Sequence, residues 1–235
     1  MLQRILEPEV MDSVEEAQDY DSMDHSEVNR RFVEHLLECR RDSDGTTDNP
    51  VKVLDVGTGT AQIPIELARS LELIHVPFQI TAIDLAEHML ELGQENIEQA
   101  GFSEWIHLEL VDAKQMPYAD GSFDWVISNS IIHHIPEPLA SLREMVRVLA
   151  PGGLLFVRDL LRPVDLPTLR HLVQTYVGGS NAHQQQMFSD SLHAALSLEE
   201  IQQKLTTIGC PIEWATQTTD RHWTIRGRKP DNVSP

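Results

Sequence analysis

The chain has 235 residues, of which 41% are hydrophobic and 23% charged, enough for one α/β domain with its own core. Acidic residues outnumber basic ones by 37 to 18, giving a formal net charge of −19. This balance disfavours nucleic acid and anionic membrane surfaces as partners. Two distant cysteines, Cys39 and Cys210, favour a reduced environment, and no signal-peptide pattern or apolar run of transmembrane length occurs. We therefore expect a cytoplasmic protein that does not insert into membranes.

Residues 1–49 are expected to form an acidic N-terminal arm followed by a packing helix. The first part is read as a mobile lead, and its acidic residues are Glu7, Glu9, Asp12, Glu15, Glu16, Asp19, Asp21 and Asp24. From Ser26 onward, apolar residues recur at helical spacing, as in Val28, Phe32 and Leu36. A polar loop over residues 41–50 then leads into a second region, residues 50–235.

A strand, a tight turn and a helix follow one another from Val51 onward. Apolar strand formers end at Val56, and Gly57 and Gly59 come directly after them. Glycine permits positive φ and lets a ligand approach the backbone closely, and the next helix directs free N–H groups at the turn. Gln62 stands where the dinucleotide fingerprint has its third glycine, which disfavours an NAD-binding site.

Two more predicted strands end in aspartate. The strand over 79–84 closes with Asp84, where a carboxylate can accept both hydroxyls of a ribose, although an aspartate there can also cap the following helix. The strand over 106–111 is followed by Asp112 and Ala113.

A buried strand over 123–128 precedes Asn129 and a histidine pair, His133 and His134. Ligands of open parallel sheets bind beyond the carboxyl ends of the strands, so this segment is expected to lie near the reaction site. One histidine can serve as a general base, although packing or capping the helix over 138–149 is an equally simple role.

These motifs together resemble the class I S-adenosylmethionine (SAM) methyltransferases. The resemblance covers roughly residues 51–160 and rests on Asp55-x-Gly57-x-Gly59-x-Ala61, Asp112-Ala113, Ser122-Phe123-Asp124 and Pro151-Gly152-Gly153. Ala61 departs from the glycine that the family usually carries. The branch that looks most similar contains the ubiquinone and menaquinone C-methyltransferases.

The resemblance implies an α/β fold: a Rossmann-like, seven-stranded, mostly parallel sheet with helices on both faces. An antiparallel C-terminal hairpin is expected from the strand-like runs over 212–218 and 222–226. The family resemblance also implies SAM as cofactor, with S-adenosylhomocysteine as product. The cofactor residues would be Asp55, Gly57, Thr58, Gly59, Ala61, Asp84, Leu85, Met89, Asp112, Ala113 and Asn129.

Residues 160–196 leave the core pattern and are expected to form a lid insertion. Arg162 and Arg170 within it are candidates for binding an anionic group of the substrate, and Tyr20 of the N-terminal arm would line the site by family analogy. The basic cluster Arg226, Arg228 and Lys229 is read as a device that keeps an edge strand soluble.

We therefore expect SN2 methyl transfer to an O, N or C nucleophile of a small-molecule acceptor, with His134 or His133 as candidate catalytic residue. A protein methyltransferase and a non-catalytic SAM-binding regulator are the alternatives. No metal ligands are expected, and neither the acceptor nor the oligomeric state can be predicted.

Overall fold

The computed structural model describes residues 1–8, 10, 12–23, 25–41, 44–45 and 49–231. Glu9, Asp24 and residues 42–43 and 46–48 of the expected polar loop lie outside this set. The chain divides into two compact units. The glycine-turn unit consists of Val10–Asn129, Ala140–Val157 and Arg226–Pro235, and the histidine unit of Met1–Glu9, Ser130–Leu139 and Arg158–Ile225. The sequence instead predicts a single boundary between residues 49 and 50.

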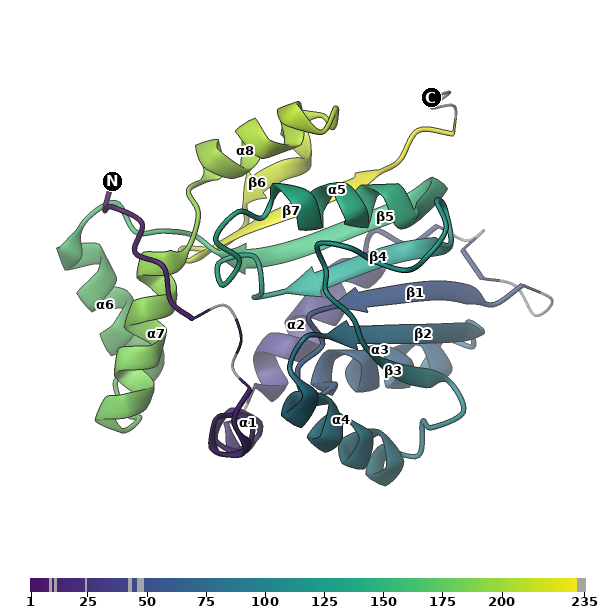
Figure 1. The fold of residues 1–235 in the computed structure, drawn as a ribbon, viewed down its shortest axis with the longest axis horizontal. Helices are drawn as coiled ribbons and strands as arrows, with labels where there is room; N and C mark the ends of the chain where they lie inside the picture. Colours follow the sequence, from purple (N-terminus) through teal and green to yellow (C-terminus); the bar gives the residue numbers. More distant parts are fainter. Residues whose placement is uncertain (9, 11, 24, 42–43, 46–48, 232–235) are drawn as a thin grey trace. The chain divides into compact units, whose positions relative to one another are not determined.

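Seven strands form one sheet in the order β3-β2-β1-β4-β5-β7-β6 (Figure 1). They are β1 (Val51–Val56), β2 (Phe78–Asp84), β3 (Ile106–Leu110), β4 (Phe123–Asn129), β5 (Leu149–Leu160), β6 (Ala215–Gln217) and β7 (His222–Arg228). β1 pairs in parallel with β2 and β4, β2 pairs in parallel with β3, and β6 pairs antiparallel with β7. The predicted α/β fold class, with its C-terminal hairpin, is confirmed.

The glycine-turn unit contains the main apolar core. Its helices are α1 (Val14–Ser22), α2 (Ser26–Leu37), α3 (Gln62–Leu73), α4 (Glu87–Ala100) and most of α5 (Leu139–Val148). Trp125, Phe156 and Phe32 are fully buried among the aliphatic residues of β1, β2 and α3. α4 ends where Gly101 adopts φ = 81°, as expected for a glycine that stops a helix.

The histidine unit contains α6 (Leu166–Val177), α7 (Ala182–Ala194), α8 (Leu198–Thr207) and a short 3₁₀ helix, η1 (Ile212–Trp214). Their starts follow local side-chain chemistry: Asp165 caps α6, and capping boxes open α7 and α8. The spacing of Ser197 and Glu200 in the sequence already predicts the second of these boxes, and the structure contains it. α6 and α7 lie side by side (Figure 1), and both pack on Leu160.

Three local expectations were wrong. The acidic lead contains α1, because Ala17 and Tyr20 share a helix face that packs on Ala86 and Met89. The sequence predicts a strand over 153–159 after the glycine turn, whereas β5 already begins at Leu149, because the Gly152 N–H bonds to the Lys229 carbonyl across the turn.

The third wrong expectation concerns the basic cluster at the end of β7. β6, and not β7, lies at the sheet edge. The Arg228 guanidinium pairs with Asp44 at 2.5 Å, and Lys229 Nζ donates to the carbonyls of Val146 and Leu149. Two of the three cations therefore close internal contacts of the glycine-turn unit.

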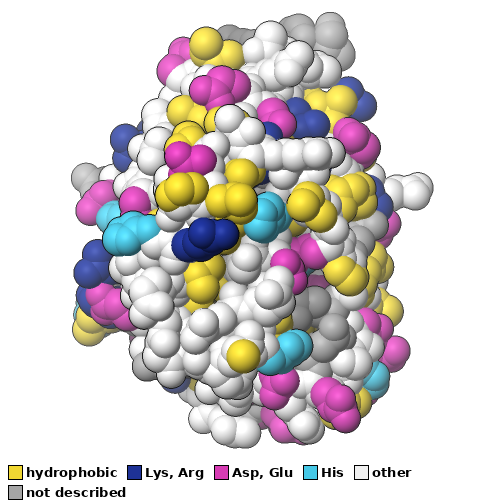
Figure 2. Space-filling model, turned by 90° about the vertical axis from the view of Figure 1, so that its left-hand side faces the viewer, with side chains coloured by type: hydrophobic (Ala, Val, Ile, Leu, Met, Phe, Trp, Pro, Cys, Tyr) yellow, Lys and Arg dark blue, Asp and Glu magenta, His cyan; other side chains and the backbone are white. Residues whose placement is uncertain are grey.

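Acidic side chains are scattered over the face shown in Figure 2, among basic and apolar ones, and do not gather in one patch there. Among the residues that the structure describes, no helix has the length and apolar character needed to span a membrane.

Candidate active site

The turn after β1 is built from backbone conformations that favour glycine. Gly57, Gly59 and Ala61 all have positive φ, at 75°, 54° and 61°. The N–H groups of Gly57 and Thr58 both donate to the Ile83 carbonyl, which ties the turn to the end of β2. α3 begins at Gln62, directly after Ala61, so its first N–H groups adjoin the turn.

Asp84 holds the turn from the neighbouring strand end. Its Oδ2 accepts from the Gly59 N–H at 2.8 Å, and its Oδ1 accepts from the N–H groups of Leu85 and Ala86 at 2.8 and 3.0 Å. A carboxylate offers about four acceptor positions, so about one remains for an outside donor. Asp84 thus organises the turn and the start of α4 and retains capacity for a hydroxyl.

Asp55 is buried at the end of β1, and its Oδ2 has no hydrogen-bond partner among the described residues. Burial raises the pKa of Asp55 to about 7, the nearby Thr58 side chain opposes the rise, and the charge of Asp84 adds to it. No described side chain neutralises Asp55, so the turn can accept a positively charged ligand group.

Tyr20 of α1 lies over the glycine turn. A Cβ built on Gly59 would lie 3.6 Å from Tyr20 Cε1. Burial, together with the charges of Asp84 and Asp55, raises the pKa of Tyr20 to about 12, so the phenol stays protonated. The sequence therefore named a residue that the fold brings to the predicted cofactor residues.

Two aspartates fasten α1 and its lead to the glycine-turn unit. Asp12 accepts from the His88 N–H at 3.1 Å, and Asp21 accepts from the side-chain amides of Gln62 and Asn96 at 3.1 and 2.9 Å. From the sequence, only an acidic stretch is predicted here, and the partners lie 41 to 76 positions away. No local signal could have found them.

The remaining predicted cofactor residues lie in the same unit. Asp112 Oδ1 accepts from the Lys114 N–H at 2.8 Å, as an ordinary loop cap does, and its second oxygen lies outside that bond. Met89 is buried under α1, and Leu85 is exposed. Ala113 is half-buried beside Asp112, and Asn129 ends β4.

The histidine unit brings His133 against Asp159, the aspartate near the end of β5. His133 Nδ1 lies 2.5 Å from Asp159 Oδ1, and both side chains are buried. Burial alone would lower the pKa of His133, but the charge and hydrogen bond of Asp159 outweigh it and raise that pKa. Burial alone would raise the pKa of Asp159, and the charge of His133 outweighs it and lowers that pKa.

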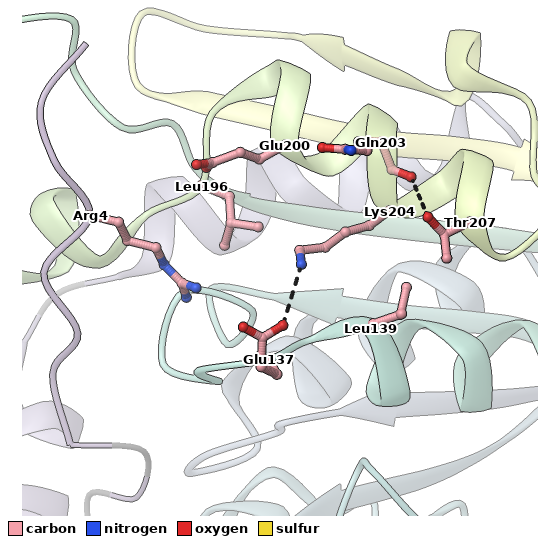
Figure 3. A pocket seen from close by; sticks show the side chains of 8 residues that line it. All are labelled: Arg4, Glu137, Leu139, Leu196, Glu200, Gln203, Lys204 and Thr207. Atoms are coloured by element: carbon pink, nitrogen blue, oxygen red, sulfur yellow. Dashed lines mark hydrogen bonds and ion pairs between the residues drawn. The ribbon is translucent and has the colours of Figure 1, made fainter.

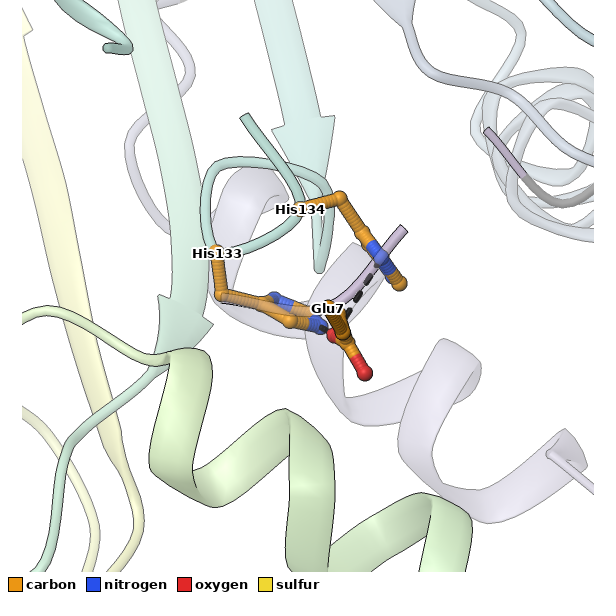
Figure 4. Close-up of side chains that lie close together, drawn as sticks. All are labelled: Glu7, His133 and His134. Atoms are coloured by element: carbon orange, nitrogen blue, oxygen red, sulfur yellow. Dashed lines mark ion pairs between the residues drawn. The ribbon is translucent and has the colours of Figure 1, made fainter. Parts of the chain in front are cut away.

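His134 faces Glu7 of the N-terminal segment, with its Nδ1 3.2 Å from Glu7 Oε1 (Figure 4). Burial, followed by the charge of His133, lowers the pKa of His134 to about 3. A neutral imidazole of such low basicity is poorly matched to general-base work near pH 7. The catalytic role predicted for His134 therefore needs a direct test.

The two arginines of the expected lid differ in their surroundings. Arg162 is buried, and its guanidinium pairs with Glu200 at 2.7 Å and donates to the Ala195 carbonyl. Its charge is thus used inside the histidine unit. Arg170 is exposed on α6, where a substrate anion can reach it.

A polar pocket of about 290 Å³ also lies in the histidine unit (Figure 3). Arg4, Glu137, Glu200 and Lys204 supply its charges, and Lys204 lies 3.8 Å from Glu137. None of the predicted cofactor residues lines it.

Fold and glycine turn together define a Rossmann-like nucleotide-cofactor protein. Residues 47–218 match the methyltransferase-domain family, and the chain belongs to that family. The resemblance to class I SAM-dependent methyltransferases is thereby confirmed.

Curated relatives include two demethylmenaquinone methyltransferases, each 34% identical to this chain. The match to the Desulfitobacterium hafniense protein covers 47% of this chain and 43% of that one. The match to the Staphylococcus haemolyticus protein covers 53% and 49%. The chain thus spans about half the length of the curated relatives it matches.

Two solved structures share the fold at low sequence identity. A SAM-dependent methyltransferase from Aquifex aeolicus superposes with a TM-score of 0.66 at 18% identity, covering 92% of this chain and 98% of that one. The YcgJ protein from Bacillus subtilis superposes with a TM-score of 0.60 at 17% identity, covering 88% of this chain and 100% of that one. At such identities the likeness supports the fold alone.

Proposed function

We propose that the protein is a SAM-dependent methyltransferase acting on a small-molecule acceptor. The observation that carries the proposal is the pair of carboxylates at the glycine turn: Asp84, with about one acceptor position left, and Asp55, buried with its Oδ2 lacking a hydrogen-bond partner among the described residues. SAM offers ribose hydroxyls to the first and a cationic methionine part to the second. The residues therefore fit the cofactor.

When bound, SAM supplies an electrophilic methyl group. The chain's own residues would then act by position: Gly57, Gly59 and Ala61 shape the turn, Asp84 fixes the ribose, and Tyr20 covers Gly59. Asp112 and Ala113 would contact the adenine. Holding an acceptor in line with the methyl group supplies much of the acceleration in such a reaction, so the site does not require a strong base.

The relatives named as demethylmenaquinone methyltransferases suggest the acceptor class to test first. Carbon nucleophiles of reduced naphthoquinone type head the screen, followed by phenols and amines. His133 and His134 are retained as candidates for handling the acceptor's proton. The His134→Ala variant is expected to lose turnover with an unchanged SAM affinity, and unchanged turnover would remove His134 from the site.

The decisive experiment is a two-part assay. Calorimetric titration with SAM is expected to give one site, and Asp84→Asn should weaken it by about 10- to 100-fold because a charged hydrogen-bond acceptor is lost. S-adenosylhomocysteine release is then scored across the acceptor panel. SAM binding without turnover on any acceptor favours the regulatory alternative, and labelled methyl recovered in protein favours the protein methyltransferase.

A further inference from the structure

Three buried side-chain atoms that lack a hydrogen-bond partner within the described part of the chain converge in the histidine unit. Glu7 Oε1, His133 Nε2 and His134 Nδ1 are buried and have no hydrogen-bond partner among the described residues. Glu7 Oε1 lies 3.4 Å from His133 Nε2 and 3.2 Å from His134 Nδ1, and all three atoms lie within 4.8 Å of one another. Figure 4 shows the three side chains pointing toward one another. Buried polar atoms normally find a partner, so this arrangement calls for one from outside the chain.

We propose that Glu7, His133 and His134 bind a divalent transition-metal ion of the zinc type. Two imidazole nitrogens and one carboxylate oxygen form a known zinc ligand set, whereas magnesium and calcium prefer oxygen ligands throughout. Ligand atoms about 2.0–2.1 Å from a tetrahedral zinc lie roughly 3.3 Å apart, close to the two distances measured from Glu7 Oε1. Three protein ligands leave a fourth position for water or another oxygen ligand.

The surroundings of the histidines orient their lone pairs toward the shared point. The hydrogen bond from His133 Nδ1–H to Asp159 leaves Nε2 free to coordinate, and Asp159 is itself held by the Ile132 and His133 N–H groups. His134 also has a backbone partner at Pro8. Metal-binding histidines characteristically have such partners at the second nitrogen.

The N-terminal segment that carries Glu7 is fastened within the same unit. Arg4 donates to four backbone carbonyls, those of Ala194, Pro136, His133 and Ile135, at 2.7 to 3.2 Å. The second carboxylate oxygen of Glu7 accepts from Ser191 Oγ at 3.3 Å. Glu7 Oε2 is therefore held by a hydrogen bond from Ser191, and Glu7 Oε1 remains available to the ion.

The rival explanation is a proton shared between Glu7 and the histidines, with no metal. It keeps the same distances but predicts no stoichiometric metal binding. The metal site departs from the expectation drawn from the sequence, which named no metal ligands. It does not depend on the proposed methyltransferase function, because it is tested by binding alone.

The test uses the full chain, stripped with a chelator and exchanged into chelator-free buffer. Zn²⁺ is titrated in competition with a chromophoric chelator, and Co²⁺ is titrated while the visible spectrum is recorded. We expect one equivalent of Zn²⁺ and the intense visible bands of four-coordinate Co²⁺. Glu7→Gln and His134→Ala should each weaken Zn²⁺ binding at least 10-fold. His183→Ala, which removes an exposed histidine of α7, should leave it unchanged.

Asp159→Asn is expected to weaken Zn²⁺ binding by about 10- to 100-fold, as for other residues that orient a metal ligand. Circular dichroism and thermal melts establish that each variant is folded. Glu7→Gln keeps the shape of its side chain and lies outside every helix and strand, so it decides the question if a histidine variant unfolds. Wild-type protein that binds less than half an equivalent, or Glu7→Gln that binds like the wild type, would overturn the proposal.

Discussion

Asp55 and Asp159 are the same residue type, both fully buried and both near the carboxyl end of a strand, yet their environments are opposite. Asp55 has an unpaired oxygen, and burial raises its pKa to about 7. For Asp159, burial also favours the neutral form, but the charge and hydrogen bond of His133, with the Leu160 N–H, outweigh it and lower the pKa. The chain satisfies one carboxylate internally and leaves an oxygen of the other without a hydrogen-bond partner among the described residues.

The difference separates a structural role at Asp159 from the binding role that we propose for Asp55. A buried carboxylate that the chain pairs with a histidine holds that histidine in place. A buried carboxylate that the chain leaves unpaired lowers the stability of the free protein and regains it when a cation binds. Substitution should therefore destabilise the protein at Asp159 and stabilise the ligand-free protein at Asp55.

The largest expected effect is the loss of stability in Asp159→Ala. The substitution removes the His133 partner and leaves the N–H groups of Ile132 and Leu160 without an acceptor. Breaking a buried pair in this way costs about 3–5 kcal/mol. Urea unfolding of the wild type and variant measures the change.

The matched control is Asp124→Ala in β4, where a half-buried aspartate accepts one backbone N–H, that of Lys52. We expect a cost of about 1 kcal/mol there. Equal losses at the two positions would contradict the distinction between Asp159 and an ordinary strand aspartate.

Asp55→Asn should stabilise the ligand-free protein, where Asp159→Ala destabilises it, and this gain should depend on pH. The folded-state pKa of Asp55 is raised from 3.8 to about 7, so the native state binds more protons than the unfolded state between these values. Wild-type stability should then fall as pH rises from about 4 to about 7, by at most roughly 4 kcal/mol at ~1.4 kcal/mol per pH unit.

Asparagine carries no charge, so the variant should lack this decline. Thermal melts of the two proteins from pH 4 to pH 8 provide the comparison, and the gap between them should narrow when SAM is added. Parallel pH profiles would show that Asp55 is not the titrating group.

The glycine-turn unit was largely predictable from the sequence because its information is local. The turn, Asp84 and the strand end at Asp112 lie within runs of a few residues whose backbone geometry fixes their roles. The uncertain part was whether Asp84 caps a helix or binds a ligand, and its bonds to Gly59 and Ala86 allow both.

The histidine unit was not predictable in the same way. The sequence named His133 and His134 but not Glu7, Arg4 or Asp159 as their neighbours. Glu7 reaches the histidines across more than 120 positions, and its neighbours in the sequence differ little from an ordinary acidic stretch. Asp159 offered one signal, an acidic residue at the end of a buried strand, as Asp84 did.

A smaller effect is expected when Tyr20 is changed. Tyr20→Ala uncovers Gly59 and should weaken SAM binding about 10-fold, equivalent to about 1.4 kcal/mol. Tyr20→Phe keeps the ring and should retain most of the affinity. Tyr176→Ala, in α6 of the histidine unit, is the control and should leave SAM affinity unchanged. Calorimetry distinguishes the four proteins, and an Ala variant that binds SAM like the wild type would remove Tyr20 from the site.

The smallest effect is expected for Ala61→Gly, which restores the glycine usual in the family. Ala61 has φ = 61°, a left-handed conformation that glycine adopts without steric cost. Replacing alanine with glycine there relieves about 1–2 kcal/mol of strain. The buried methyl group that is lost was worth about 0.8 kcal/mol, and the added freedom of the unfolded chain costs about 0.4–1 kcal/mol more. These terms nearly cancel, so stability should change by less than about 1 kcal/mol.

Ala68→Gly makes the same chemical change at a fully buried position of α3. Ala68 is in ordinary helical conformation, so no strain is relieved and both costs remain, about 1.2–1.8 kcal/mol together. Urea unfolding of the two variants therefore isolates the strain at the glycine turn. Equal destabilisation would mean that the turn bears no strain at Ala61, and that this departure from the family pattern costs the fold nothing.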